Sequence, residues 1–163
     1  MGAFFAKEIM EAAIQIEGNG QRFYQQMSQK AVAPGARESF AYLAEQERQH
    51  IADIRALAGR LPDPPETWER EEFTMYLVDL ASEHVFRQDG SGEQMAQRVG
   101  SDREAVDLGI RFEKDTILFV QEFRKLVRVE DQELVDGLVG WEKDHLVRLV
   151  RLKWELEGKA RAC

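Results

Sequence analysis

The sequence predicts an all-α fold, a bundle of four long helices arranged as two helical hairpins. All four prolines of the 163-residue chain lie between positions 34 and 65, so long stretches lack the strongest helix breaker. Within these stretches apolar residues recur with alternating spacings of three and four, as on the buried face of a helix. A connection of about 40 residues separates the two hairpins and is long enough to run the length of a bundle.

The first hairpin is predicted at the N-terminal end of the chain. Its first helix is expected at about residues 4–31, closed by Pro34-Gly35. Its second helix is expected at about residues 37–58, because the apolar pattern resumes there and Gly59 follows where a C-terminal cap belongs. The short link makes these two helices antiparallel neighbours.

The long connection is predicted to contain short helical segments of its own. One of these is indicated by four residues at helical spacing, Phe73, Leu77, Leu80 and His84, and residues 94–99 are expected to form another turn or two. An apolar helix in the connection favours a crossover that packs on the bundle, so residues 1–163 are predicted to form one domain. The alternative is a disordered spacer between two hairpin domains.

The second hairpin is predicted to begin at Ser101-Asp-Arg-Glu104. This pattern indicates a capping box, in which the serine hydroxyl and the glutamate carboxylate each accept from a free backbone N–H. The third long helix then runs to about residue 127. Glu130 or Asp131 can cap the fourth, which runs to about residue 157 before Gly158.

The composition disfavours several kinds of partner. Thirty acidic residues against 22 basic ones give a formal net charge of −8, which argues against nucleic acid. No stretch reaches the roughly 18 apolar residues that a membrane span needs, and the N-terminus does not have the pattern of a secretion signal, so no membrane partner and a cytoplasmic location are expected. The single cysteine, Cys163, excludes an intrachain disulfide and a multi-thiolate metal site. Any metal is therefore expected to be held by oxygen and nitrogen.

An internal repeat contains the residues suited to metal chemistry. With an offset of 95 residues the second and fourth helices align, and Glu47-Arg-Gln-His50 falls on Glu142-Lys-Asp-His145. With an offset of 96 the first and third helices align, and Glu17 falls on Glu113. Each glutamate occupies a position of its helix's apolar stripe, and the three-residue spacing places each histidine on the same face. All six side chains are therefore predicted to face the bundle interior.

Four buried carboxylates near one another need compensating charge. Two like charges about 4 Å apart repel by roughly 4 kcal/mol at an effective dielectric near 20, and each also loses its hydration. Two divalent cations would balance the four charges, and two imidazoles would complete their coordination. The predicted metal ligands are Glu17, Glu47, His50, Glu113, Glu142 and His145. The alternative is a solvated helix face on which the glutamates pair with neighbouring basic residues.

This pattern resembles the ferritin-like di-iron carboxylate superfamily and, within it, the rubrerythrin family. The resemblance covers about residues 4–157 and implies a ferritin-like four-helix bundle whose long crossover contains a short helix. It implies two iron ions, or manganese, or zinc as an adventitious occupant. Glu47 and Glu142 would bridge the ions, Glu17 and Glu113 would be terminal ligands, and Tyr24 would hydrogen-bond near them. The alternative for Tyr24 is a core tyrosine with a satisfied hydroxyl.

The resemblance also implies a function in oxidative-stress defence, as a di-iron oxidoreductase that reduces peroxide or O2 in the manner of a peroxidase or ferroxidase. The sequence lacks the Cys-x-x-Cys pairs of a rubredoxin domain, so an external electron donor is expected, and the family favours a homodimer. Many rubrerythrins have an additional carboxylate one turn from the third-helix ligand, where this chain has Ile110 and Thr116. The alternatives are therefore an iron-handling protein without turnover and a helical interaction module.

Other conspicuous residues are interpreted as structural. His84 continues the apolar stripe of the crossover helix, so Glu83-His84 is expected at a packing or subunit interface rather than at a metal. Trp141 and Trp154 are expected to be ordinary packing or interface residues.

Overall fold

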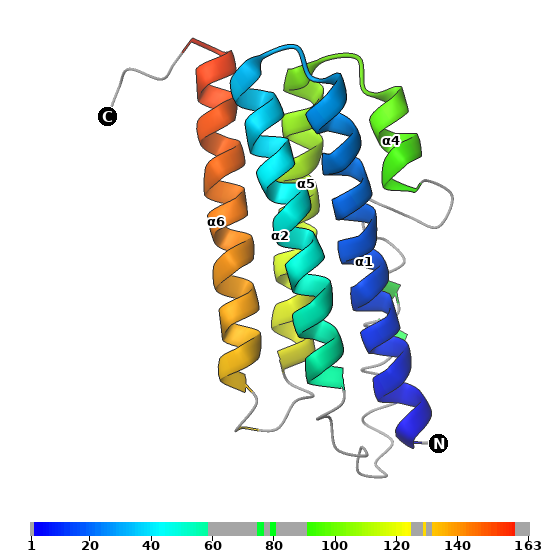
Figure 1. The fold of residues 1–163 in the computed structure, drawn as a ribbon. Coiled ribbons are helices and arrows are strands. Elements are labelled where there is room, and N and C mark those ends of the chain that lie inside the picture. The colour runs from blue at the N-terminus through cyan, green and yellow to red at the C-terminus, as the bar shows by residue number, and fades with distance from the viewer. Residues whose placement is uncertain are drawn as a thin grey trace.

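Four long helices run side by side in the computed structural model, and a short fifth helix packs along one of them (Figure 1). The structure describes residues 2–58, 75–76, 79–80, 91–124, 129 and 132–158. Its helices are α1 (Gly2–Lys30), α2 (Pro34–Ala58), α4 (Gly92–Arg98), α5 (Asp102–Phe123) and α6 (Gln132–Leu156). The predicted all-α, ferritin-like bundle is confirmed. Among the described helices none combines the length and the apolar character needed to cross a membrane.

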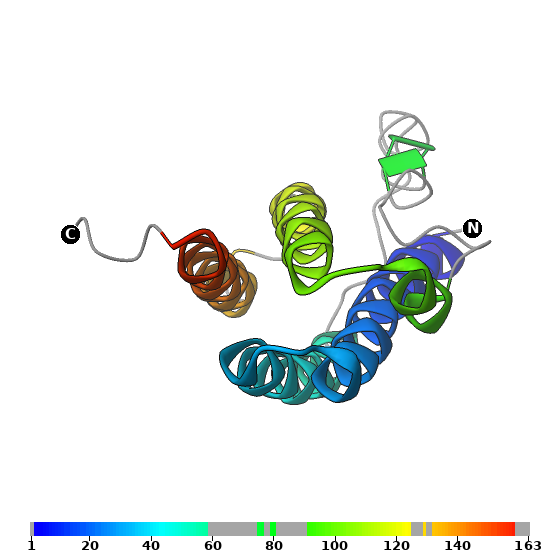
Figure 2. The same cartoon turned by 90° about the horizontal axis from the view of Figure 1, so that it is seen from above.

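The four long helices pair as two hairpins, as predicted. α1 packs against α2, and α5 packs against α6. The hairpins meet through contacts of α2 with α6 and of α1 with α5, so the two helices that contain Glu-x-x-His are neighbours across the bundle (Figure 2). α4 lies outside this arrangement against α1, where the Lys30 ammonium donates to the carbonyls of Ala96 and Val99 at 2.8 and 2.6 Å.

The link between α1 and α2 is shorter than predicted. α2 begins at Pro34 rather than near residue 37, so Pro34 opens the second helix and does not lie in a longer loop. Proline suits the first helical position because its fixed φ is helical and the N–H that it lacks would have no helical partner there. The Asp102 carboxylate accepts from the backbone N–H groups of Val32 and Ala33 at 3.0 and 2.7 Å, which ties this link to the start of α5.

The predicted capping box before α5 is present in part. The serine makes the expected hydrogen bond, whereas the glutamate accepts from a different backbone N–H. The Ser101 hydroxyl accepts from the N–H of Glu104 at 3.2 Å. The Glu104 carboxylate accepts from the N–H of Gly100 at 2.7 Å, one residue before the cap. The predicted turn at residues 94–99 is α4, which is capped by Ser91. Gly158 follows α6 with φ 68°, the left-handed conformation expected of a glycine after a helix.

Several sequence-based predictions lie outside the described residues. These are the Gly59 cap, most of the crossover helix from Phe73 to His84 with its Glu83-His84 pair, the extension of α5 to residue 127, the Glu130 or Asp131 cap and Cys163.

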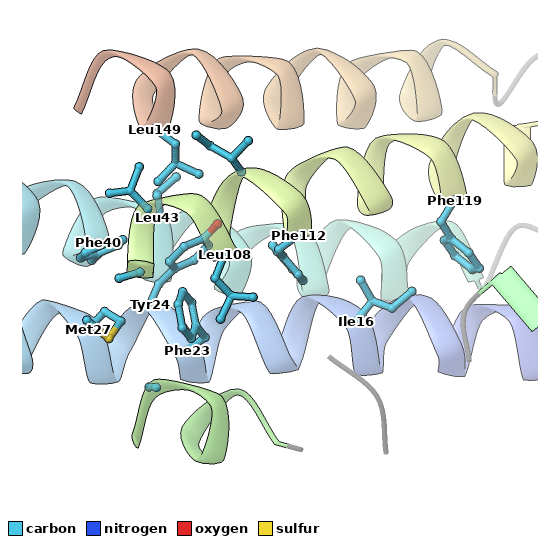
Figure 3. Packing of buried hydrophobic residues seen from close by; sticks show 14 of the residues in the cluster. Ile16, Phe23, Tyr24, Met27, Phe40, Leu43, Leu108, Phe112, Phe119 and Leu149 are labelled. Atoms are coloured by element: carbon cyan, nitrogen blue, oxygen red, sulfur yellow. The ribbon is translucent and has the colours of Figure 1, made fainter. Parts of the chain in front are cut away.

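Buried apolar side chains pack the bundle interior from Phe40 to Phe119, and a group of aromatic rings gathers around Tyr24 (Figure 3). The Tyr24 ring lies at its centre, with ring centroids 5.4 Å from Phe23, 6.0 Å from Phe40 and 5.9 Å from Phe112. Phe112 approaches α1 at Gly20, where a Cβ atom would lie only 2.3 Å from the Phe112 ring. This apolar layer lies next to the position of Glu113 and excludes water from it.

Candidate metal centre

Six polar side chains meet in the interior, where the sequence pattern places them. α1 contributes Glu17, α5 contributes Glu113, and α2 and α6 each contribute a glutamate and a histidine one turn apart. None of the six is more than 1% exposed, whereas carboxylates are almost never fully buried unless they are paired. The solvated-face alternative is therefore wrong. The side chains brought together are Glu17, Glu47, His50, Glu113, Glu142 and His145.

Three carboxylates surround each histidine. The Nδ1 atom of His50 lies 2.8 Å from Glu142 Oε1, 3.3 Å from Glu47 Oε2 and 3.6 Å from Glu17 Oε2. The Nδ1 atom of His145 has a matching environment, 3.2 Å from Glu142 Oε2, 3.5 Å from Glu47 Oε1 and 3.7 Å from Glu113 Oε2. The repeat in the sequence thus becomes a pseudo-twofold arrangement of two overlapping ligand sets.

The two sets share the carboxylates of Glu47 and Glu142. Each of these carboxylates directs one oxygen toward His50 and the other toward His145, whereas Glu17 faces only His50 and Glu113 faces only His145. In the shared group, one ligand atom from each of Glu47, His50, Glu142 and His145 lies within 4.8 Å of all the others. This geometry would allow a pair of ions to be held with the two shared carboxylates between them. The division into bridging and terminal ligands stays a prediction.

The atoms of this cluster lack the hydrogen bonds that buried polar atoms normally have. Across the six side chains, nine buried oxygen or nitrogen atoms have no hydrogen-bond partner, including both nitrogens of each histidine and both oxygens of Glu47. The close approaches between nitrogen and oxygen are not aligned for hydrogen bonding. Since about 90% or more of buried polar groups in proteins have a partner, this concentration indicates that a cation belongs here. Carboxylate oxygens and imidazole nitrogens are ligands that fit iron or manganese.

The electrostatics of the cluster support the same interpretation. Burial raises the pKa of Glu17 and of Glu113 well above the usual value, and the neighbouring Glu47 carboxylate adds to the effect on each. Burial acts in the same direction on Glu47 and Glu142, but contacts with the histidines and, for Glu47, with Glu17 outweigh it and lower the pKa of both.

Burial acts on the pKa of the two histidines in the opposite direction, because it disfavours their charged form. Burial lowers the pKa of His50, but the surrounding carboxylates outweigh it and raise this pKa to about 12. The pKa of His145 is raised for the same reason. Two divalent cations among the four carboxylates would leave the cluster with no net charge.

Tyr24 connects the aromatic layer to the cluster. Its hydroxyl donates a hydrogen bond to Glu113 Oε1, and both residues are fully buried. Burial, together with the charge of Glu113, raises the pKa of Tyr24 well above its usual value, so the phenol keeps the proton that it donates. The expected hydrogen bond near the predicted ligands is present, and it leaves Glu113 Oε2 facing His145.

Comparison with protein-family models identifies the family of the chain. The model described as Rubrerythrin matches residues 8–153. The chain belongs to the rubrerythrin family. Comparisons with curated proteins and with solved structures gave no match. Membership in a ferritin-like di-iron family, together with the buried Glu/His cluster, supports a metal-binding function.

The two positions one turn from Glu113 on α5 are not acidic. Ile110 is 8% exposed and Thr116 is buried, so the positions on either side of this ligand carry no carboxylate that could replace it. From this part of α5 the cluster receives the carboxylate of Glu113, which accepts a hydrogen bond from the Tyr24 hydroxyl.

The sequence analysis missed the aromatic rings that cover the two histidines. Trp141 was expected to be an ordinary packing or interface residue, but its ring stacks on His50, with centroids 5.4 Å apart and planes inclined by 9°. The Tyr42 ring meets His145 edge-on, with centroids 6.5 Å apart. The only signal available in the sequence was the position of Trp141 directly before Glu142. Trp154 has no such ring contact among the described residues.

Proposed function

We propose that this member of the rubrerythrin family is a di-iron oxidoreductase that reduces peroxide or O2 with electrons from an external donor. One observation carries the proposal: two overlapping sets of buried ligands share the carboxylates of Glu47 and Glu142. A pair of ferrous ions bound there would supply two electrons to a small oxidant. Family membership favours iron over the manganese and zinc alternatives.

The chain's own residues would bind and position the ions. Glu47 and Glu142 would bind both ions, Glu17 and Glu113 would each bind one, and one histidine would complete each ligand set. The Tyr24 hydroxyl orients Glu113 through its hydrogen bond and leaves the other carboxylate oxygen for the ion. The buried aromatic layer around Tyr24 keeps bulk water away from this side of the centre. The homodimer and the cytoplasmic location stay predictions.

The experiment that tests the proposal has two parts. Metal analysis of the purified protein is expected to give two transition-metal ions per chain, and a chain without bound metal would point to a helical interaction module. The protein is then loaded anaerobically with ferrous iron and mixed with peroxide or O2 in a stopped-flow instrument. Oxidation faster than that of free ferrous iron, followed by repeated turnover with a reductant, is expected. Oxidation no faster than that of free iron would contradict catalysis.

An iron-handling protein without turnover is the second candidate. It is favoured by Ile110 and Thr116 beside Glu113, because no second carboxylate is available there to rebind an ion that shifts when its charge changes. In that case the two ions would bind and exchange, and the stopped-flow experiment would show no accelerated oxidation.

A further inference from the structure

Two partly exposed aromatic rings lie directly against the buried histidines of the cluster. His50 and His145 are each 1% exposed, and their rings stack on one another with centroids 5.0 Å apart. Trp141 continues this stack beyond His50, and Tyr42 contacts the far side at His145. Trp141 and Tyr42 are each 44% exposed. Each buried histidine therefore contacts the ring of a residue that itself reaches solvent.

The two ends of the stack are not equivalent. Trp141 and His50 lie nearly parallel, with planes inclined by 9° and centroids 5.4 Å apart, the shorter of the two outer ring separations. Tyr42 and His145 are nearly perpendicular, at 84° and 6.5 Å, and the Arg148 guanidinium lies 4.3 Å from the Tyr42 ring centre. The Trp141 end is therefore the more direct connection between solvent and the cluster.

The internal repeat does not account for the tryptophan. Under the offset that superimposes the two Glu-x-x-His motifs, Trp141 corresponds to Gln46, and Tyr42 corresponds to Gly137. The ligands are duplicated, whereas the rings that cover them are not. The stacked indole is thus a feature of one end of the centre rather than a consequence of the duplicated fold.

We propose that Trp141 is the electron-transfer residue through which an external one-electron donor reaches the metal pair. This inference rests on the proposed function, because it concerns reduction of the same centre. Each donor molecule loses one electron, which crosses the indole of Trp141 and the imidazole of His50 and reduces the metal pair by one electron. Two transfers replace the two electrons that one peroxide molecule takes up, with two protons, when it is reduced to two water molecules.

The test uses the full-length protein and four variants. Trp141→Leu removes the ring, and Trp141→Phe keeps an aromatic ring in the stack. Trp154→Leu is the matched control, because Trp154 lies on the same helix, is 45% exposed and is about 20 Å further along the axis at 1.5 Å per residue. Tyr42→Leu removes the ring at the other end. Metal content and thermal unfolding are measured first for every variant.

The first readout needs no catalytic activity. Anaerobic titration with Co²⁺ is expected to quench an indole signal in the wild type and in Trp154→Leu, and this quenching is expected to be lost in Trp141→Leu. The second readout is the rate at which reduced methyl viologen, a one-electron donor, reduces iron-loaded protein that has been oxidised with ferricyanide. Trp141→Leu is expected to slow this reduction several-fold, Trp141→Phe less, and Tyr42→Leu and Trp154→Leu little.

A purely structural role of Trp141 predicts different results. If Trp141 only shields the centre, its removal should change metal retention, or should change oxidation by peroxide as much as reduction by the donor. The proposal expects unchanged metal stoichiometry and slower reduction alone. It is overturned if Trp141→Leu is reduced as fast as the wild type, if both half-reactions change together, or if reduced methyl viologen does not reduce the wild type. Because ferricyanide prepares the oxidised state, these results stand even if peroxide fails to react, an outcome that would instead contradict the proposed function.

Discussion

Replacing Glu47 by alanine is expected to abolish binding of both metal ions, whereas replacing Glu17 by alanine is expected to abolish binding of only one. The difference follows from the geometry of the two carboxylates. Glu47 directs Oε2 toward His50 at 3.3 Å and Oε1 toward His145 at 3.5 Å. Of the two histidines, Glu17 approaches only His50, with Oε2 at 3.6 Å from Nδ1. Loss of a shared ligand is therefore expected to weaken metal binding at both positions, and loss of a terminal ligand at one position only.

The size of the effect can be worked from the charge that is lost. Removing one partner of a buried ion pair costs about 3–5 kcal/mol, because the remaining charge is left uncompensated. At about 1.4 kcal/mol per factor of ten, this weakens binding by roughly two to three and a half orders of magnitude. Glu47→Ala is expected to raise both dissociation constants by this factor. Glu17→Ala is expected to raise one and to leave the position at His145 near its original affinity.

Equilibrium dialysis against Fe²⁺ under anaerobic conditions, followed by metal analysis, measures these stoichiometries. Thermal unfolding gives an independent readout, since a ligand at 100 times its dissociation constant stabilises the native state by about 2.7 kcal/mol. This stabilisation should disappear in Glu47→Ala. Glu45→Ala is the control, because Glu45 lies on the same helix but is exposed and paired with Arg48. Two ions retained by Glu47→Ala, or both lost by Glu17→Ala, would refute the division into shared and terminal ligands.

Three further predictions concern protons, the tyrosine and packing. Loading the metal-free protein with two divalent ions is expected to release protons, because the ions compete with protons for the groups whose pKa is raised, so affinity should increase as the pH rises. Titration with a pH indicator checks this, and a pH-independent affinity would count against it. Tyr24→Phe leaves Glu113 Oε1 without its donor and is expected to lower the free energy of unfolding by about 1–3 kcal/mol and metal affinity by about 10–100-fold; urea unfolding and metal competition that match the wild type would contradict this role. Gly20→Ala places a Cβ 2.3 Å from the Phe112 ring and is expected to destabilise the protein by about 1–3 kcal/mol. Gly140→Ala on α6, with no neighbour within 4 Å, is expected to stabilise it by up to about 1 kcal/mol, and similar urea midpoints for the two variants would refute the close-packing argument.

The bundle could be predicted from the sequence because its signals are local. Apolar periodicity, the absence of proline from the interiors of the long helices and the cap at Ser101 each act within a few residues of the feature that they determine. The second helix was predicted to start near residue 37 rather than at Pro34, and this error also comes from relying on local signals. A proline after a helix can lie in the loop or occupy the first position of the next helix, and the choice depends on how the two helices meet.

The ligands could be predicted because the internal repeat places them on faces that must be buried. Glu47 and Glu142 occupy equivalent positions of an apolar stripe, and the structure brings them together with both histidines. The contact of Tyr24 with Glu113 joins residues 89 positions apart and could be expected only from family resemblance. The ring contacts of Trp141 and Tyr42 could not be predicted, because both residues lie beside the buried stripe. Their contacts depend on the approach of α2 to α6 and on the rotation of each helix.

The duplicated hairpin constrains the ligands of the centre more tightly than it constrains their surroundings. Because Glu47 and Glu142 belong to both ligand sets, losing either of these carboxylates would unbalance the charge of both sets, so the two hairpins must supply matching acids there. The residues that cover the histidines have no such requirement, and Trp141 faces His50 whereas the equivalent position in the first hairpin is Gln46. Two positions with the same ligands therefore have different connections to solvent. Under the proposed function, two ions in matching ligand sets would supply two electrons, and the asymmetric cover would let a donor deliver electrons to the centre from one side.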